Sequence, residues 1–139
     1  MVDLPEKKVG IISCSGEGCV EGTISRVATR MVLEQLRPDQ TVTICLPLFL
    51  AGGEEERTFA RYYPTITVDG CRKLCAKVGT ERYSGKVASS IVVTDLAANN
   101  PGFSRSSSRR QLDRETLILA EKVAQRIAKE VDEMPGHWR

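Results

Sequence analysis

Short apolar runs rich in β-branched residues alternate along this chain with segments that carry turn residues or helical periodicity. The runs span residues 8–13, 41–45, 65–68 and 87–94. Runs of this length, separated by helical segments, are typical of buried strands joined by right-handed crossovers. The alternation therefore predicts a three-layer α/β fold with a mainly parallel four-stranded sheet in the order 2-1-3-4.

The segments between these runs have the patterns of helices. Apolar side chains recur with a period near 3.6 in residues 23–36, and the most regular stripe spans residues 113–132. A short helix is expected over residues 54–62, and another begins near Cys71. No repeat with a period of roughly 20 to 50 residues is visible, so residues 1–139 are predicted to form one Rossmann-like domain.

The composition allows a single core without help from disulfides. The chain has 139 residues, of which 41% are hydrophobic, and this suffices for one ordinary domain. The chain contains no run of ~18 apolar residues, the length needed to span a membrane. The N-terminus lacks the basic start and apolar middle of a signal peptide. We therefore expect a cytoplasmic protein with no membrane partner.

The charge pattern bears on partners. The net charge of +2 arises from 20 basic and 18 acidic residues that are mostly interleaved. Because no dominant basic field results, nucleic-acid binding is not expected. Residues 104–112 are rich in Ser and Arg and are expected to form a mobile, solvated loop. Arg105, Arg109 and Arg110 leave open a contact of this loop with an anion or a protein partner.

Five cysteines, an odd number, occur in a chain expected in a reducing compartment, where thiols serve more often as ligands or reactive groups than in disulfides. Four of them fall where predicted strands end. Cys14 follows the first strand, Cys45 closes the second, and Cys71 and Cys75 open the helix after the third. Because ligands bind at the carboxyl edge of open parallel sheets, we expect these four thiols to converge there.

The spacing of Cys71 and Cys75 at i and i+4 puts both sulfurs on one face of a helix, with the β-carbons about 5–6 Å apart. The helix N-terminus favours the thiolate form of Cys71, which a soft metal requires. Four thiolates at ~2.3 Å would form a closed zinc site, whereas three would leave one position open. A single cysteine is more often a buried core residue than a ligand, so the predicted metal site rests on all four cysteines together. The role of Cys19 is left open: it is a fifth ligand, a resolving thiol or a residue that only fills space in the core.

The cysteine-bearing segments resemble those of a known family. The relevant segments are residues 68–76 (VDGCRKLCA), Cys14-Ser15-Gly16, and Cys45-Leu46 followed by Ala51-Gly52. Together they resemble the DGC-domain family, a group of proteins thought to bind zinc, over about residues 8–95. The Asp-Gly-Cys-x3-Cys element is the most specific part of this resemblance.

The resemblance implies that Cys14, Cys45, Cys71 and Cys75 form a metal site, and it implies no particular reaction. Asp69 of the motif has three open roles: it ligates the metal, orients a thiolate, or caps the following helix, as Asp commonly does. The longer segment after Cys45, Cys19 and the Ser/Arg loop depart from the family pattern.

Other motifs fit less well. Gly16-x-Gly18-x3-Gly22 misses the spacing of a dinucleotide-binding turn by one residue, and no acidic residue closes the second strand. The single histidine, His137, falls in a short tail expected over residues 133–139, so a Cys–His nucleophile pair is not favoured.

The sequence thus favours a metal-binding protein, with zinc as the expected ion, that acts in metal handling or sensing. The alternative is a thiol-based enzyme for sulfur, methyl or electron transfer at the same cysteines. An iron–sulfur cluster on the four thiolates also remains open, as does an adaptor with a protein partner and a purely structural metal. The metal content of the purified protein would separate these hypotheses.

Overall fold

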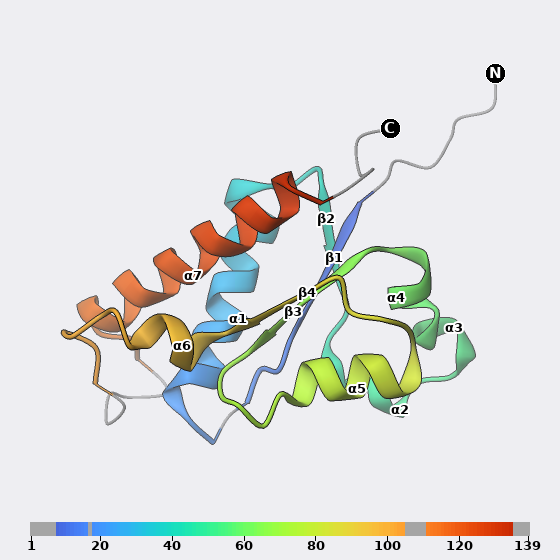
Figure 1. Cartoon of the computed structure of the whole chain (residues 1–139), viewed down its shortest axis with the longest axis horizontal. Coiled ribbons are helices and arrows are strands. Elements are labelled where there is room, and N and C mark those ends of the chain that lie inside the picture. Colours follow the sequence, from blue (N-terminus) through green and yellow to red (C-terminus); the bar gives the residue numbers. More distant parts are fainter. Residues whose placement is uncertain (1–7, 17, 105–110, 135–139) are drawn as a thin grey trace.

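A computed structural model of the chain describes residues 8–16, 18–104 and 111–134. Within these ranges the sheet has four strands: β1 (Val9–Ser13), β2 (Thr41–Thr43), β3 (Thr65–Asp69) and β4 (Ser89–Val92). All neighbouring strands are parallel, in the order β2-β1-β3-β4. The predicted sheet and its strand order are confirmed, and helices lie on both faces (Figure 1).

One face of the sheet is covered by two long helices and by shorter segments beside them (Figure 1). They are α1 (Val20–Met31), which continues into the π-helical turn η1 (Val32–Leu36), α7 (Arg114–Asp132) and the short α6 (Val93–Ala97). Asp113 begins α7 by accepting a hydrogen bond from the Thr116 amide at 2.8 Å. Both long helices therefore form where the periodicity predicts them.

The other face is covered by short helices (Figure 1). They are α2 (Leu46–Ala51), α3 (Glu54–Arg57), α4 (Phe59–Tyr62) and α5 (Cys75–Tyr83). The single helix predicted over residues 54–62 is divided at Thr58 into α3 and α4. α2 was not predicted, although Pro47 in its first turn and the buried pair Leu46 and Phe49 are consistent with a short helix.

Alternate residues of the central strands point to opposite faces, which divides the core into two parts. Ile11, Ile66 and Val68 belong to a large aliphatic cluster with α1 and α7. Ile12, which follows Ile11 on β1, belongs to a small cluster with residues of α2 and α5: Leu46, Phe49 and Ala76. The thiol-bearing helices therefore rest on the smaller part of the core.

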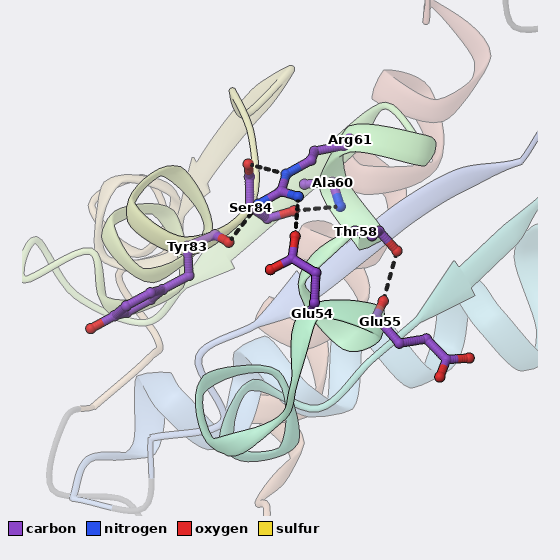
Figure 2. Close-up of polar contacts among 7 residues, drawn as sticks. All are labelled: Glu54, Glu55, Thr58, Ala60, Arg61, Tyr83 and Ser84. Atoms are coloured by element: carbon purple, nitrogen blue, oxygen red, sulfur yellow. Dashed lines mark hydrogen bonds and ion pairs between the residues drawn. The ribbon is translucent and has the colours of Figure 1, made fainter.

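The C-terminal end of α5 is tied to α3 and α4 by Arg61 (Figure 2). Its guanidinium donates hydrogen bonds to the carbonyl oxygens of Tyr83 at 3.3 Å and Ser84 at 2.9 Å, and it pairs with Glu54 at 2.6 Å. Ser84 Oγ in turn accepts a hydrogen bond from the Ala60 amide at 3.0 Å. A cation at this end complements the helix dipole, so α5 is held at the end opposite its cysteine.

Several predictions fall partly outside the described residues. Residues 105–110 of the Ser/Arg loop, with their three arginines, and residues 135–139, with His137, are not described. Met134, which falls in the tail expected over residues 133–139, is buried in the larger core cluster. No helix of the described chain is long and apolar enough to cross a membrane. That residues 1–139 form one domain stays a prediction.

Candidate metal centre

The four candidate cysteines all follow strands at the carboxyl edge of the sheet. Cys14 comes directly after β1, and Cys71 lies in the turn after β3. β2 ends at Thr43, so Cys45 does not close that strand as predicted; it is the N-cap residue of α2. Cys75 is the first residue of α5. All four thiols are free in the structure.

Cys14 is the most firmly held of these side chains. Its backbone amide donates to Val68 O at 2.9 Å and extends the pairing of β1 with β3. Its sulfur accepts a hydrogen bond from the Gly70 amide at 3.2 Å and lies 3.4 Å from Ser25 Oγ. Ser25 gives its one proton to Gly22 O at 2.6 Å, so in this arrangement the Cys14 thiol donates to Ser25. The sulfur is thus fixed on two sides.

The glycine of the Asp-Gly-Cys motif has a steric role. A β-carbon on Gly70 would lie 2.6 Å from the Gly22 amide nitrogen, and one on Gly22 would lie 1.9 Å from Gly16 O. Both distances are too short for any side chain, so the backbones of three segments meet here without side chains between them. This contact holds the turn after β3 against the start of α1 and brings the Gly70 amide to Cys14.

Asp69 caps α5 across the turn. Its side chain is buried, and its two carboxylate oxygens accept hydrogen bonds from the Ala76 amide at 2.7 Å and the Lys77 amide at 3.2 Å. Burial raises the pKa of Asp69, while these two amides and the Lys77 charge oppose that rise. Of the three roles left open for Asp69, the contacts show helix capping, since both oxygens are already engaged by backbone donors.

The predicted helical pairing of Cys71 with Cys75 is wrong. Residues 71–74 form a turn, closed by a hydrogen bond from the Leu74 amide to Cys71 O at 3.2 Å. Leu74 has φ 56° and ψ 42°, a left-handed conformation that cannot lie inside a right-handed helix. The helix therefore begins at Cys75, and Cys75 rather than Cys71 occupies its N-terminus.

The pKa of one candidate thiol is shifted. The pKa of Cys75 is raised, first by desolvation and then by the negative charges of Asp69, Cys14 and Cys71, while a backbone hydrogen bond lowers it. Charges act in this way only over short distances. The thiolate expected to be favoured at the helix N-terminus was that of Cys71, but Cys75 occupies this position and its pKa is raised. The contact that links two candidate segments is that of the Cys14 sulfur with the amide of Gly70, which directly precedes Cys71.

Exposure does not divide the five cysteines into a candidate group and the rest, since Cys75 is exposed and Cys14 and Cys71 are half-buried. Cys45 lies at the same edge of the sheet as these three. Cys45 is exposed, and Cys19 is a half-buried N-cap residue of α1 whose side chain makes no capping hydrogen bond. In residues 8–16, 18–104 and 111–134, no three Cys, His, Asp or Glu side chains already stand in the geometry of a metal site.

The chemistry of the donors nevertheless fits a thiophilic metal ion. Four cysteines follow strands at one edge of the sheet, and the Gly70 amide donates a hydrogen bond to the sulfur of Cys14. Thiolates are the ligands that zinc and related soft ions prefer, and amide donors to sulfur stabilise them. Cys14, Cys71 and Cys75, with Cys45, are the residues that would hold such an ion.

Sequence reasoning missed two buried polar side chains of α1. Ser25 is fully buried beside Cys14, and Glu21, one turn earlier, is also buried. The available signal was their position on the inward face of the predicted helix, where a polar residue needs a partner. Ser25 orients a candidate ligand, which no spacing rule would reveal.

Comparison with known families identifies the family of this chain. The family model described as DGC domain matches residues 10–117, which include all five cysteines and the described strands except Val9 of β1. The chain belongs to the DGC-domain family. The match reaches beyond the predicted span into the first turn of α7. Searches of the curated proteins and of the solved structures found no match.

Proposed function

We propose that this DGC-domain protein binds a thiophilic metal ion, zinc in the first place, through the thiolates of Cys14, Cys71 and Cys75 with Cys45 as the fourth ligand. The observation that carries this proposal is the hydrogen bond that the Cys14 sulfur accepts from the Gly70 amide of the family motif, at the sheet edge where the other candidate cysteines follow their strands. The ion is cargo or signal in this proposal, so the protein acts in cytoplasmic metal handling or sensing.

The chemistry of the site supports binding over acid–base catalysis. A bound ion requires the thiols to lose their protons and turn toward a common point, since no ready ligand set exists among the described residues. The Gly70 amide is already placed to stabilise the Cys14 thiolate. The buried carboxylate of Asp69, which precedes the turn, is occupied in holding α5.

Titration with cobalt(II) tests the proposal, since cobalt replaces zinc and absorbs in the visible when thiolates bind it. We expect thiolate-to-cobalt charge-transfer bands that saturate at one equivalent and disappear when zinc is added. Cys14→Ser and Cys75→Ser should each abolish or strongly weaken the bands. Cys19→Ser is the matched control and should leave them intact. Absence of these bands in the wild-type protein would contradict the proposal.

One observation favours the alternative of a thiol enzyme at the same cysteines. In the described chain, the two non-glycine residues with positive φ are Ser15 and Leu74, and each adjoins one of the candidate cysteines. Backbone strain of this kind collects at active sites. Against it, the pKa of Cys75 is raised, which disfavours the reactive thiolate. Rapid alkylation of one cysteine in the metal-free protein at neutral pH would favour the enzyme.

An iron–sulfur cluster would use the same thiolates. Visible absorbance of the protein as purified without oxygen distinguishes it from zinc, which is colourless.

A further inference from the structure

The buried hydroxyl of Ser25 on α1 has two partners in the described chain. It donates a hydrogen bond to Gly22 O at 2.6 Å, and it lies 3.4 Å from the sulfur of Cys14. Because a hydroxyl has one proton, which the shorter contact places on Gly22 O, the Cys14 thiol supplies the proton of the longer contact. Without an ion, Ser25 is therefore the acceptor of the thiol.

This hydrogen bond can be reversed at little cost. Gly22 lies within α1, where a carbonyl oxygen also accepts the backbone amide four residues on. If the Ser25 hydroxyl turns away, Gly22 O keeps this helical partner. On its other side, the Cys14 sulfur already accepts the Gly70 amide at 3.2 Å, and the residue is only half-buried, so it remains accessible to an ion.

We propose that Ser25 is a positioning residue for the metal site, and that its hydroxyl reverses its hydrogen bond with Cys14 when the ion binds. This inference rests on the proposed function and adds an outer partner to one of its ligands. In the metal-free protein the Cys14 thiol donates to Ser25. In the metal-bound protein Ser25 donates to the Cys14 thiolate, which then accepts two hydrogen bonds, one from Ser25 and one from the Gly70 amide.

The change involves no oxidation or reduction. The bond between Cys14 Sγ and its proton breaks, the sulfur binds the ion through the freed electron pair, and the proton passes to solvent. The Ser25 hydroxyl then rotates about its C–O bond, and its own proton moves from Gly22 O to the sulfur. Hydrogen bonds to a ligand thiolate spread its negative charge and fix its direction, and the loss of such an outer partner lowers metal affinity by about 10- to 100-fold.

Thr29 of the same helix provides a matched control. It lies one turn after Ser25 and is also buried, and its hydroxyl donates to Ser25 O at 2.8 Å. A hydrogen bond of this kind, from a side chain to a carbonyl one turn back, serves the helix alone. Among the hydrogen bonds of the described residues, that of Thr29 reaches no cysteine, so the contact with Cys14 distinguishes Ser25.

Infrared spectroscopy of the full-length, metal-free protein tests the first state. The S–H stretch of Cys14 is identified as the band that Cys14→Ala removes. Donation to Ser25 weakens the S–H bond, so this band should move to higher frequency in Ser25→Ala and stay in place in Thr29→Val. If Ser25→Ala leaves the band unmoved, the thiol does not donate to Ser25 and the inference is overturned, whereas metal binding is untouched by that result.

Cobalt titration of the same proteins tests the second state. Ser25→Ala should raise the cobalt dissociation constant by about tenfold or more. Its charge-transfer band should move to longer wavelength, because a thiolate without this donor gives up its electrons more readily. Thr29→Val should match the wild type in both respects. Both variants should keep the wild-type circular dichroism spectrum, since Ala favours a helix and Val nearly keeps the shape of Thr.

Two cobalt results would overturn the inference. If Ser25→Ala matches the wild type in affinity and band position, Ser25 does not donate to the bound thiolate. If Thr29→Val changes both as much as Ser25→Ala does, the effect comes from the packing of α1 and not from the contact with Cys14. A wild-type protein that takes up no ion refutes the proposed function itself, a result that is distinguishable because the infrared measurement does not depend on a metal.

Discussion

The two faces of the sheet differ in packing and in chemistry. Toward α1 and α7, seventeen buried apolar residues of the described chain form one cluster. Toward α2 and α5, the corresponding cluster contains four, and β3 presents Thr65, Thr67 and Asp69 there. Three of the four candidate ligands are attached to this second face or to its helices, Cys14 included. Stability thus resides mainly on one face, which leaves the other free to carry polar groups and thiols.

The largest effect that tests this comparison concerns two neighbouring residues of β1. Ile11 and Ile12 are both fully buried but point to opposite faces. Ile11→Ala should destabilise the fold by about 4 kcal/mol and Ile12→Ala by about 2–3 kcal/mol, because the short helices can relax into the smaller cavity. Urea denaturation of the metal-free variants measures both. Equal losses, or a larger loss for Ile12→Ala, would show that the second face is as tightly packed as the first.

A second prediction concerns the glycine that joins the two faces at the site. Gly70→Ala forces a β-carbon against the backbone at Gly22, and should cost ~1–3 kcal/mol and displace the amide that contacts Cys14. Cobalt binding should weaken with it. Gly18→Ala is the matched control, because nothing lies within 4 Å of a β-carbon there. A Gly70→Ala protein with wild-type stability and cobalt spectrum would refute the steric role.

Loss of the Asp69 cap of α5 should lower the free energy of unfolding only slightly and should weaken metal binding more clearly. Asp69→Ala removes the acceptor of two amides in the first turn and should cost about 1 kcal/mol. Because Cys75 is the first residue of that turn, the metal dissociation constant should rise as well. Competition against a chelator of known affinity measures this rise. A variant less stable by this amount but unchanged in metal affinity would mean that Asp69 has no part in positioning Cys75.

The smallest effect belongs to the surface of the well-packed face. Arg37 binds both carboxylate oxygens of Asp132, at 2.8 and 2.6 Å, and lowers its pKa. The folded state therefore favours ionised Asp132, so this stabilisation is present above the ordinary carboxyl pKa and is lost as the pH falls through the lowered value. The pair is partly exposed, so Asp132→Asn should cost less than ~1 kcal/mol at neutral pH and low salt. If Asp132→Asn cost the same free energy of unfolding at high salt or in acid, the loss would not come from the ion pair with Arg37.

The architecture could be predicted because it follows from patterns that are local in sequence. β-branched runs and helical stripes fixed the sheet order and α7, whose start and cap at Asp113 match the predicted segment. The start of α5 could not be predicted, because it depends on Leu74 adopting a left-handed conformation that its sequence does not favour. The same limit applies to Ser25, whose contact with Cys14 depends on how α1 packs on the sheet.

The location of the candidate site could be predicted from the sequence, but the differences in exposure and hydrogen bonding among its cysteines could not. The rule that ligands bind at the carboxyl edge located the cysteines. Which thiols are exposed or hydrogen-bonded depends on turns and helix starts, and these distinguish Cys14, whose sulfur is hydrogen-bonded, from the exposed Cys45 and Cys75. Whether the four act as one ligand set stays a prediction.

Elemental analysis of the protein purified without oxygen tests the central claim most directly. The wild-type chain should contain about one equivalent of zinc or another thiophilic metal per chain. Cys71→Ser, prepared in the same way, should contain much less while keeping the wild-type circular dichroism spectrum. A wild-type protein with well under one equivalent, and with no uptake when zinc is titrated in, would contradict the account.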